Sequence, residues 1–128
     1  MSVFDAIAAA EKLLPGHPAP DGEIDARWQA IIAVGEFIEA EPEAVWQFAR
    51  RWGCTSDEDL RAAVSTCLLE HLLEYHFDSL FPEMEAAARA ESAFAKALGM
   101  CWHFGLTETP DRAARLRSLL IELAVRRQ

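Results

Sequence analysis

The chain has 128 residues, which is enough for one domain of ordinary size. Hydrophobic residues make up 52% of it, and Gly and Pro contribute only 6 residues each. This composition excludes intrinsic disorder for the bulk of the chain and disfavours a turn-rich β-sandwich or barrel. The formal net charge of −9 argues against a general affinity for nucleic acid or anionic membranes, because both attract cationic surfaces.

The first two predicted helices flank a proline-rich loop. Ser2 and Asp5 form a capping box ahead of apolar residues that recur at helical spacing, which predicts a helix ending near Leu14. Residues 15–22 contain three prolines and predict a loop. A second apolar stripe predicts a helix over residues 23–40, with acidic side chains at its positive N-terminal end.

The middle of the chain carries the clearest helical pattern. Pro42 suits the first position of a third helix, and Gly53 suits its end. Ser56 then caps a predicted helix over residues 56–76 that is apolar over most of its circumference. Only a narrow wedge stays polar, formed by Thr66, Glu70 and Glu74. Because such a helix packs on more than one side, we expect it to be the most buried element.

Three further helices complete the prediction. Pro82 opens a short helix that ends near residue 90, another covers residues 92–104, and the last begins at Pro110 and ends in arginines. No alternation typical of strands is present. We therefore predict a single all-α domain over residues 1–128, with six or seven helices in antiparallel pairs.

A possible internal repeat relates residues 41–76 to residues 93–128, because residues 53–76 fall on 105–128 after a shift of 52 positions without a gap. The identical pairs are Gly53 and Gly105, Thr55 and Thr107, Asp59 and Asp111, Ala62 and Ala114, Leu68 and Leu120, and Glu70 and Glu122. Two ordinary amphipathic helices with a shared period would explain the apolar matches. They would not explain the glycine and threonine matches, so the pattern favours a genuine repeat.

The segment WGCTSDEDLRAAVSTCLLEHLL resembles the second helix of a HEAT-type (armadillo-like) repeat with its approach turn. The resemblance is carried by an acidic turn, an arginine and then small and branched apolar residues, namely Asp57, Asp59, Arg61, Ala62, Ala63, Val64, Leu68 and Leu72. It is best over residues 42–76, and the second unit departs from it because Ala113 stands in place of the arginine. The resemblance implies a short array of stacked helix pairs, and such proteins mostly bind other macromolecules.

Glu70, His71, Glu74 and His76 form the one cluster in the sequence that could hold a metal, and the first three are the candidates for a metal site or a small enzyme. Metal sites in helical bundles use Glu-x-x-His steps on two helices, whereas here the order is reversed and no second helix supplies a matching step. A cysteine nucleophile would need Cys67 with His71 or Cys101 with His103. Cys67 and His71 have the right spacing on one helix face, but Cys67 lies on the apolar stripe, where a buried thiol is inert. We therefore predict no metal, no cofactor and no catalysis, and keep this cluster as the alternative.

Charge is distributed unevenly along the chain. Residues 1–109 have a net charge of −12, whereas residues 110–128 have a net charge of +3. The arginines of the last helix are Arg112, Arg115, Arg117, Arg126 and Arg127. Pairing of these arginines with the acidic body is the favoured interpretation, and a nucleic-acid contact through them is the second alternative.

Trp46 lies one position off its predicted stripe, beside Arg50, and an exposed Trp next to Arg is typical of a binding anchor. A partly covered edge residue is the other interpretation of Trp46. We predict a non-catalytic protein-binding module, either an adaptor or an immunity- or antitoxin-like protein, that recognises a basic partner. The candidate contact residues are Trp46, Arg50, Glu70 and Glu74.

The predicted compartment is the cytoplasm. The N-terminal residues have no basic lead and include Asp5 and Glu11, unlike a secretory signal, and no stretch of about 18 residues is apolar enough to span a membrane. Cys54, Cys67 and Cys101 are widely spaced and odd in number, which favours free thiols over disulfides or a zinc site. Free thiols are typical of a reducing environment.

Overall fold

The computed structural model describes residues 1–20 and 22–126, and within them every regular element is helical, so the predicted all-α class is confirmed. The α-helices are α1 (Val3–Leu13), α2 (Ala26–Gly35), α3 (Pro42–Trp52), α4 (Glu58–Val64), α5 (Glu70–Ala90), α6 (Ser92–Gly99) and α7 (Pro110–Arg126). A π-helical turn, η1 (Ser65–Leu69), joins α4 to α5, and a 3₁₀ turn, η2 (Gly105–Glu108), precedes α7. None of these described helices has the length and apolarity needed to cross a membrane.

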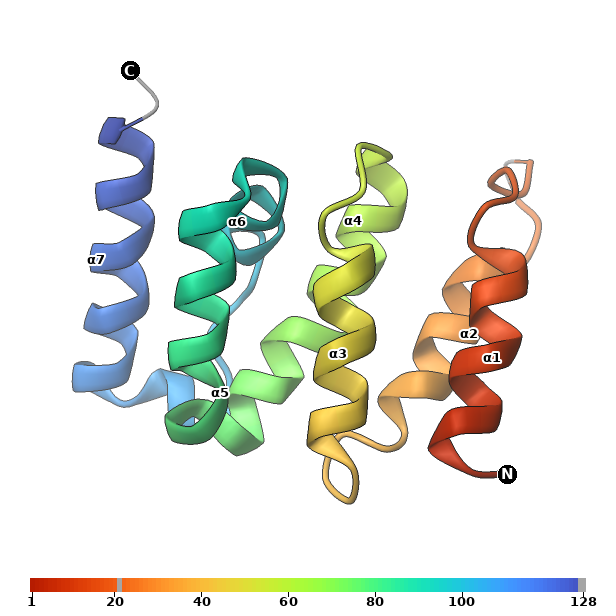
Figure 1. Cartoon of the computed structure of the whole chain (residues 1–128), viewed down its shortest axis with the longest axis horizontal. Helices are drawn as coiled ribbons and strands as arrows, with labels where there is room; N and C mark the ends of the chain where they lie inside the picture. The colour runs from red at the N-terminus through yellow and green to blue at the C-terminus, as the bar shows by residue number, and fades with distance from the viewer. Residues whose placement is uncertain (21, 127–128) are drawn as a thin grey trace.

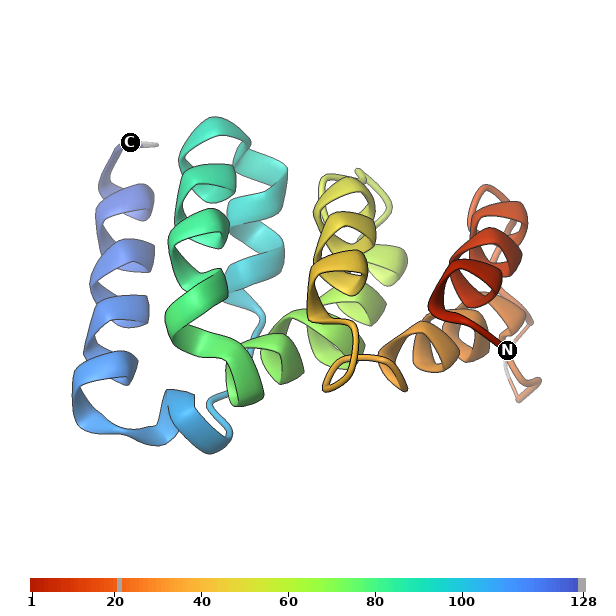
Figure 2. The same cartoon turned by 60° about the horizontal axis from the view of Figure 1, so that its bottom comes forward.

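The helices form an elongated array of two layers (Figures 1 and 2). Helices α1, α3, the second half of α5 and α7 lie in one layer, and α2, α4 and α6 lie behind them. Helix α1 packs on α2, α3 packs on α4 and η1, and α5 packs on α6. The array has α1 at one end of its long axis and α7 at the other. The resemblance to HEAT-type repeats stays a prediction.

Side-chain caps set where the helices begin. Ser2 and Asp5 form the predicted capping box, with both hydrogen bonds present. Helix α2 begins later than predicted because Asp25 caps it, accepting a backbone N–H of the first turn. Asp57, and not Ser56, caps α4 by accepting the N–H of the third helical residue. The predicted starts of these three helices are therefore correct to within a few residues.

The segment from α4 to α5 departs most from the prediction. It does not end at His76 but kinks there, at backbone angles of φ −134° and ψ 35°. The Ile38 carbonyl accepts a hydrogen bond from Nε2 of His76 at 2.9 Å, which ties the kink to the turn after α2. Pro82 consequently lies inside α5, where the prediction had a new helix starting. At the kink the chain turns from one layer of the array into the other (Figure 1).

The predicted helix over residues 92–104 is too long, because α6 ends at Gly99 and the next residues lead away from it. Gly105 then has a positive φ of 52°, whereas Gly53, its partner in the possible repeat, has a right-handed helical φ of −66°. A Cβ at Gly105 would lie 2.6 Å from Cγ of Glu74, so only glycine fits there. The repeat stays a prediction, and its two glycines have different conformations.

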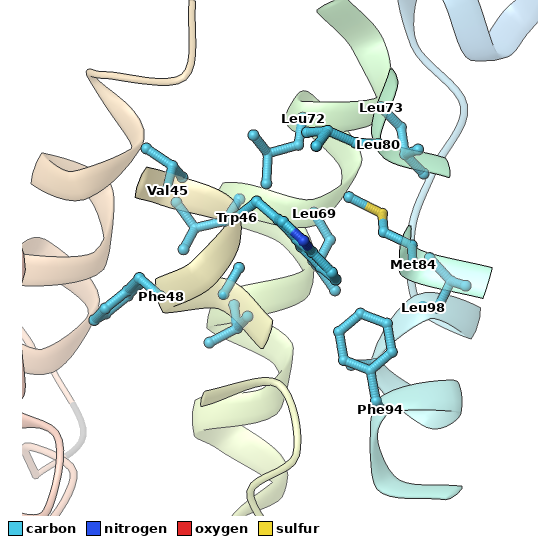
Figure 3. Packing of buried hydrophobic residues seen from close by; sticks show 14 of the residues in the cluster. Val45, Trp46, Phe48, Leu69, Leu72, Leu73, Leu80, Met84, Phe94 and Leu98 are labelled. Carbon is cyan, nitrogen blue, oxygen red and sulfur yellow. The ribbon is translucent and has the colours of Figure 1, made fainter. Parts of the chain in front are cut away.

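The predicted central helix supplies the middle of the hydrophobic core, as expected. Its most buried residues, at most 3% exposed, are Leu60, Ala63, Val64, Leu68, Leu69, Leu72 and Leu73. The η1 turn contacts α2, α3 and α6, so this segment is covered from more than one side. Figure 3 shows Leu69 and Leu72 beside Trp46 of α3, with Met84 and Phe94 closing the cluster towards α6.

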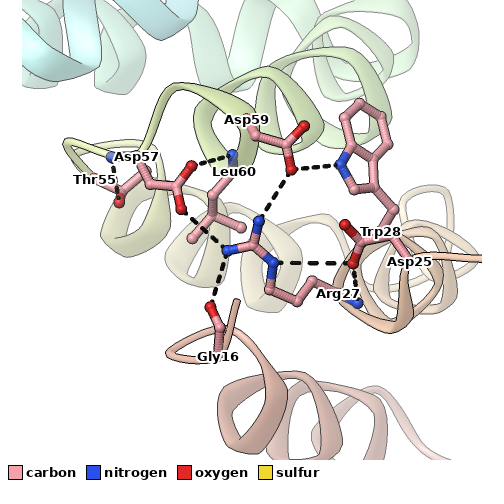
Figure 4. Close-up of polar contacts among 8 residues, drawn as sticks. All are labelled: Gly16, Asp25, Arg27, Trp28, Thr55, Asp57, Asp59 and Leu60. Atoms are coloured by element: carbon pink, nitrogen blue, oxygen red, sulfur yellow. Dashed lines mark hydrogen bonds and ion pairs between the residues drawn. The ribbon is translucent and has the colours of Figure 1, made fainter. Parts of the chain in front are cut away.

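A buried arginine connects the N-terminal helices (Figure 4). Arg27 of α2 is 3% exposed, and its guanidinium contacts Asp57 at 3.1 Å and Asp59 at 3.0 Å. It also donates to the Gly16 carbonyl at 3.2 Å, and the neighbouring Trp28 indole donates to Asp59 at 3.1 Å. These contacts join α2 to the start of α4 and to the loop after α1. A buried cation needs such partners because it has lost its water.

Truncation of the core should be severe. We expect Leu72→Ala to lower the free energy of unfolding by about 2–5 kcal/mol, because it removes buried methyl groups and leaves a cavity. Ile24→Ala, at a side chain that is 81% exposed, is the control and should change stability by less than about 0.5 kcal/mol. Urea denaturation monitored by tryptophan fluorescence measures both. Equal losses in the two variants would contradict the central position of this helix.

Acid should weaken the Arg27 network. The pKa of Asp57 lies below its ordinary value of 3.8, because the Leu60 N–H and then Arg27 favour its carboxylate. A carboxylate whose pKa is lower in the folded state than in the unfolded state stabilises the fold. That contribution is complete above about pH 4 and is lost as the pH falls through the pKa of the folded state.

Asp57→Asn keeps a capping side chain but removes the charge. Because Asp57 is 40% exposed, we expect a stability deficit of only about 0.5–1 kcal/mol at pH 7. Urea denaturation from pH 7 to about pH 2.5 should show this deficit closing at the acid end. A difference that stays constant with pH would contradict the assignment.

Candidate functional site

Glu70 and Glu74, both predicted as solvated contact residues, lie in the first turns of α5. Glu70 is buried, at 5% exposed, and its Oε2 accepts the backbone N–H of Trp102 at 2.8 Å. The prediction of a wet surface at Glu70 is therefore wrong. The reason is that residues 100–104 leave the helix predicted for them and fold over this side of α5. Glu74 is partly exposed, as predicted for the wedge.

His71 lies between these two acids and faces both of them. Its Nδ1 is 2.7 Å from Oε1 of Glu74, its Nε2 is 3.7 Å from Oε1 of Glu70, and its ring stacks on Phe104 with centroids 5.6 Å apart. The two nitrogens of an imidazole point in diverging directions, so His71 cannot direct both towards one shared ion. Among the described residues, no group of three or more His, Cys, Asp or Glu side chains is arranged to hold a metal.

Trp46, the predicted exposed anchor, is buried, with 1% of its surface exposed. It packs edge-on against Phe94, with ring centroids 5.6 Å apart at 76°. The prediction was wrong because α3 packs against α1 on one side and α5 on another, so its buried face is wider than one stripe. Arg50 is exposed whereas Trp46 is buried, so these two residues form no joint contact site on the surface.

Of the described arginines of α7, Arg112 contacts an acid of the body of the molecule, Arg126 contacts an acid of its own helix, and Arg115 contacts aromatic rings. Arg112 binds both carboxylate oxygens of Asp78, at 2.9 and 2.7 Å, which lowers the pKa of Asp78. Arg115 lies over the Phe81 ring at 4.8 Å, and Arg126 lies 3.6 Å from Glu122. Arg127 is outside the described residues. These pairings remove charge from the surface that a nucleic-acid contact would use.

A groove of about 490 Å³, here called the Tyr75 groove, lies between the C-terminal half of α2 and the η1–α5 segment. Its lining residues are Ile32, Gly35, Glu36, Ile38, Glu39, Thr66, Cys67, His71 and Tyr75. Two of these residues are large, apolar and exposed: Ile32 has 43% of its surface exposed and Tyr75 has 48%. The groove therefore combines apolar walls with carboxylates at its edge.

Three local features shape the Tyr75 groove. Gly35 lets α2 approach closely, because a Cβ there would lie 3.2 Å from the Cys67 carbonyl. The π-helical turn η1 widens the helix at this level, and π-helical turns are frequent at functional sites. The hydrogen bond from His76 to the Ile38 carbonyl fixes the turn that carries Glu39. The groove thus follows from backbone geometry rather than from one side chain.

The electrostatics of the Tyr75 groove are acidic. Glu36 and Glu39 are exposed on the α2 side, and none of the described residues that line the groove is a lysine or arginine. The negative charges of Glu74 and then Glu39 raise the pKa of Tyr75, because the phenolate would be a further anion beside them. The same field favours cations and opposes anions in the groove.

The Cys67–His71 pair reaches the same groove but has poor properties for catalysis. Burial raises the pKa of Cys67, which disfavours the thiolate that acts as nucleophile. The Nδ1 of His71 is already bonded to Glu74. The other thiol considered from sequence, Cys101, has a pKa raised by burial to about 12. The geometry therefore gives no support to a cysteine nucleophile.

Sequence reasoning missed Glu36, Glu39 and Tyr75 as a group. The sequence places Tyr75 in the helix predicted over residues 56–76 and the two acids in the helix predicted over residues 23–40, and no motif gives any of the three a role. Their joint position depends on α2 packing against η1, the turn that leads into α5, and periodicity within one helix does not report such packing. The one available signal was Gly35 within the α2 stripe, since glycine there permits a close helix contact.

Comparison of the chain with models of known protein families, with curated proteins and with solved structures found no match. The geometry of the Tyr75 groove is therefore the basis for assigning a function.

Glu70 should matter for folding more than Glu74. Glu70→Ala leaves the Trp102 N–H without its acceptor, so we expect a loss of about 1–3 kcal/mol in the free energy of unfolding. Glu70→Gln keeps an acceptor oxygen and should lose less, and Glu74→Ala should lose less than about 1 kcal/mol because its site is wet. Urea denaturation at pH 7 compares the three. If Glu74→Ala is the most destabilising, the assignment of Glu70 is wrong.

Proposed function

We propose that the protein is a non-catalytic binding module that recognises a basic segment of a partner protein through the Tyr75 groove. The observation that carries the proposal is the lining of that groove, which places Glu36, Glu39 and the nearby Glu74 around exposed Ile32 and Tyr75. The net charge of −9 extends the same sign over the molecule and would speed the approach of a cationic partner.

The size and chemistry of the groove suit one or two long cationic side chains. A volume of about 490 Å³ is within the range of sites that hold a small ligand or part of a peptide. The aliphatic stem of a lysine or arginine would lie along Ile32, while its charged end approaches Glu36 or Glu39. The exposed Tyr75 ring offers a cation–π contact that favours arginine.

Two biological roles fit a module of this kind. An immunity- or antitoxin-like protein would neutralise a cationic effector by covering its basic surface. A small adaptor would instead hold a basic segment of one protein beside another. Both need an acidic docking surface and no catalysis. The alternatives of a metal-binding protein or enzyme and of a nucleic-acid contact have no comparable support from the geometry.

Charge reversal tests the proposal. We expect a labelled 12-residue peptide with two arginines and two leucines to bind the wild-type protein, measured by fluorescence anisotropy. Glu36→Lys/Glu39→Lys should weaken that binding at least about tenfold, because both carboxylates are replaced by like charges. Raising the salt concentration should weaken the wild-type complex, since exposed charges are screened.

The matched control is Glu23→Lys/Glu83→Lys, which changes the net charge equally at two exposed acids outside the groove. It should retain most of the affinity. Equal weakening in both double variants would show that only the overall charge matters, and the groove would lose its assigned role. NMR shifts of groove residues on titration with the peptide give a second measurement, and shifts confined to other surfaces would contradict the proposal.

A further inference from the structure

Helix α7 has no partner in the second layer of the array. Helices α2, α4 and α6 each lie behind a helix of the first layer, and among the described residues no helix takes that position behind α7 (Figures 1 and 2). One face of α7 is buried, through Leu116, Leu119 and Leu123. The opposite face carries Ile121 and Val125, exposed by 59% and 65%. An apolar helix face is thus left uncovered at one end of the molecule.

This face belongs to a concave surface, here called the α7 groove. A hollow of about 410 Å³ is lined by Gly99, Cys101, His103, Arg117, Leu120, Ile121 and Ala124. The residues from α7 repeat at the three- and four-residue spacing of a helix face, from Arg117 through Leu120 and Ile121 to Ala124. Gly99 forms part of the opposite wall and lies beside α7, since a Cβ there would be in ordinary van der Waals contact with Leu120 at 3.9 Å. Such a surface suits a packed helix.

The rim of the α7 groove is cationic in an otherwise acidic protein. Arg117 is exposed and makes no ion pair with any described residue, unlike Arg112 with Asp78 and Arg126 with Glu122. His103 lies on the other wall. No acidic residue is among those described that line the hollow. The local charge is therefore opposite to that of the Tyr75 groove, with which the α7 groove shares no lining residue.

We propose that the α7 groove binds an amphipathic helix of a second partner protein, one whose apolar stripe is flanked by acidic residues. Its apolar side chains would cover Leu120, Ile121 and Ala124, as α6 covers α5 within the array. Its carboxylates would pair with Arg117. A second copy of the chain fits less well, because antiparallel pairing of two α7 helices about Ile121 brings Arg117 of one near Arg126 of the other.

The test uses a designed probe. The probe is a fluorescein-labelled helical peptide of 18 residues, with leucines at helical spacing and glutamates on both flanks of that stripe. A scrambled peptide of the same composition has no stripe and is the peptide control. By fluorescence anisotropy we expect micromolar binding of the striped peptide to the wild-type protein and at least about tenfold weaker binding of the scrambled one.

Variants locate the binding. Ala124→Glu places a carboxylate in the groove and Arg117→Glu reverses the rim charge, so each should weaken binding at least about tenfold. Ala86→Glu, at an exposed position of α5 outside the groove, makes the same change of residue type and is the matched control, which should bind like the wild type. Circular dichroism melts check that all three variants fold, and exposed positions should leave the melting temperature within a few degrees.

Three outcomes would overturn the proposal. The first is no binding of the striped peptide at about 1 mM protein. The second is equal weakening in Ala86→Glu and Ala124→Glu. The third is a dimeric wild-type protein in size-exclusion chromatography with light scattering that Ala124→Glu converts to monomer, because the face would then belong to a second copy. Failure of the arginine peptide at the Tyr75 groove would leave this result unaffected, so the two proposals are tested separately.

Discussion

The buried guanidinium of Arg27 fixes how the N-terminal helices sit against the centre of the array. Its charge has lost most of its water and is balanced by Asp57 and Asp59 and by the Gly16 carbonyl. Because these partners come from α4 and from the loop after α1, α2 cannot shift along its neighbours without breaking them. The position of α2 in turn determines how closely Gly35 approaches η1, and therefore the walls of the Tyr75 groove. The acidic turn that resembles a HEAT-type repeat serves here as the counter-charge for Arg27.

A second constraint acts at the other end of the same groove. The kink at His76 redirects α5 from one layer of the array to the other, and the bond from its ring to the Ile38 carbonyl holds the turn after α2 against it. This one residue therefore connects the path of the backbone to the shape of the candidate site. Pro82 lies six residues beyond this kink, inside α5, where it has no backbone N–H to donate.

Local sequence signals predicted most of the helices and failed where two segments meet. Ser2 marks a helix start through a capping hydrogen bond, and Pro42 marks one through its fixed backbone angle, so both signals lie within a few residues. The stripe through Leu68 and Leu72 predicts burial because its spacing matches the helical period. Glu70 was expected to be exposed because the segment that covers it, around Trp102, lies 32 residues away and was itself predicted to be helical. Trp46 was misplaced for a similar reason, since a single helix does not reveal that neighbours pack on two of its sides. The Tyr75 groove likewise joins residues of α2 and α5, and each helix by itself looks ordinary.

The π-helical turn at Ser65–Leu69 holds one residue more than a regular helical turn. In a regular α-helix, one added residue would rotate everything after it by about 100° around the helix axis. Because the wider turn absorbs that residue, His71 keeps its contact with Phe104 and His76 its contact with the turn after α2. Winding the same number of residues into a regular α-helix would rotate both histidines away from those contacts. A segment one residue shorter could form a regular α-helix here and keep both of them.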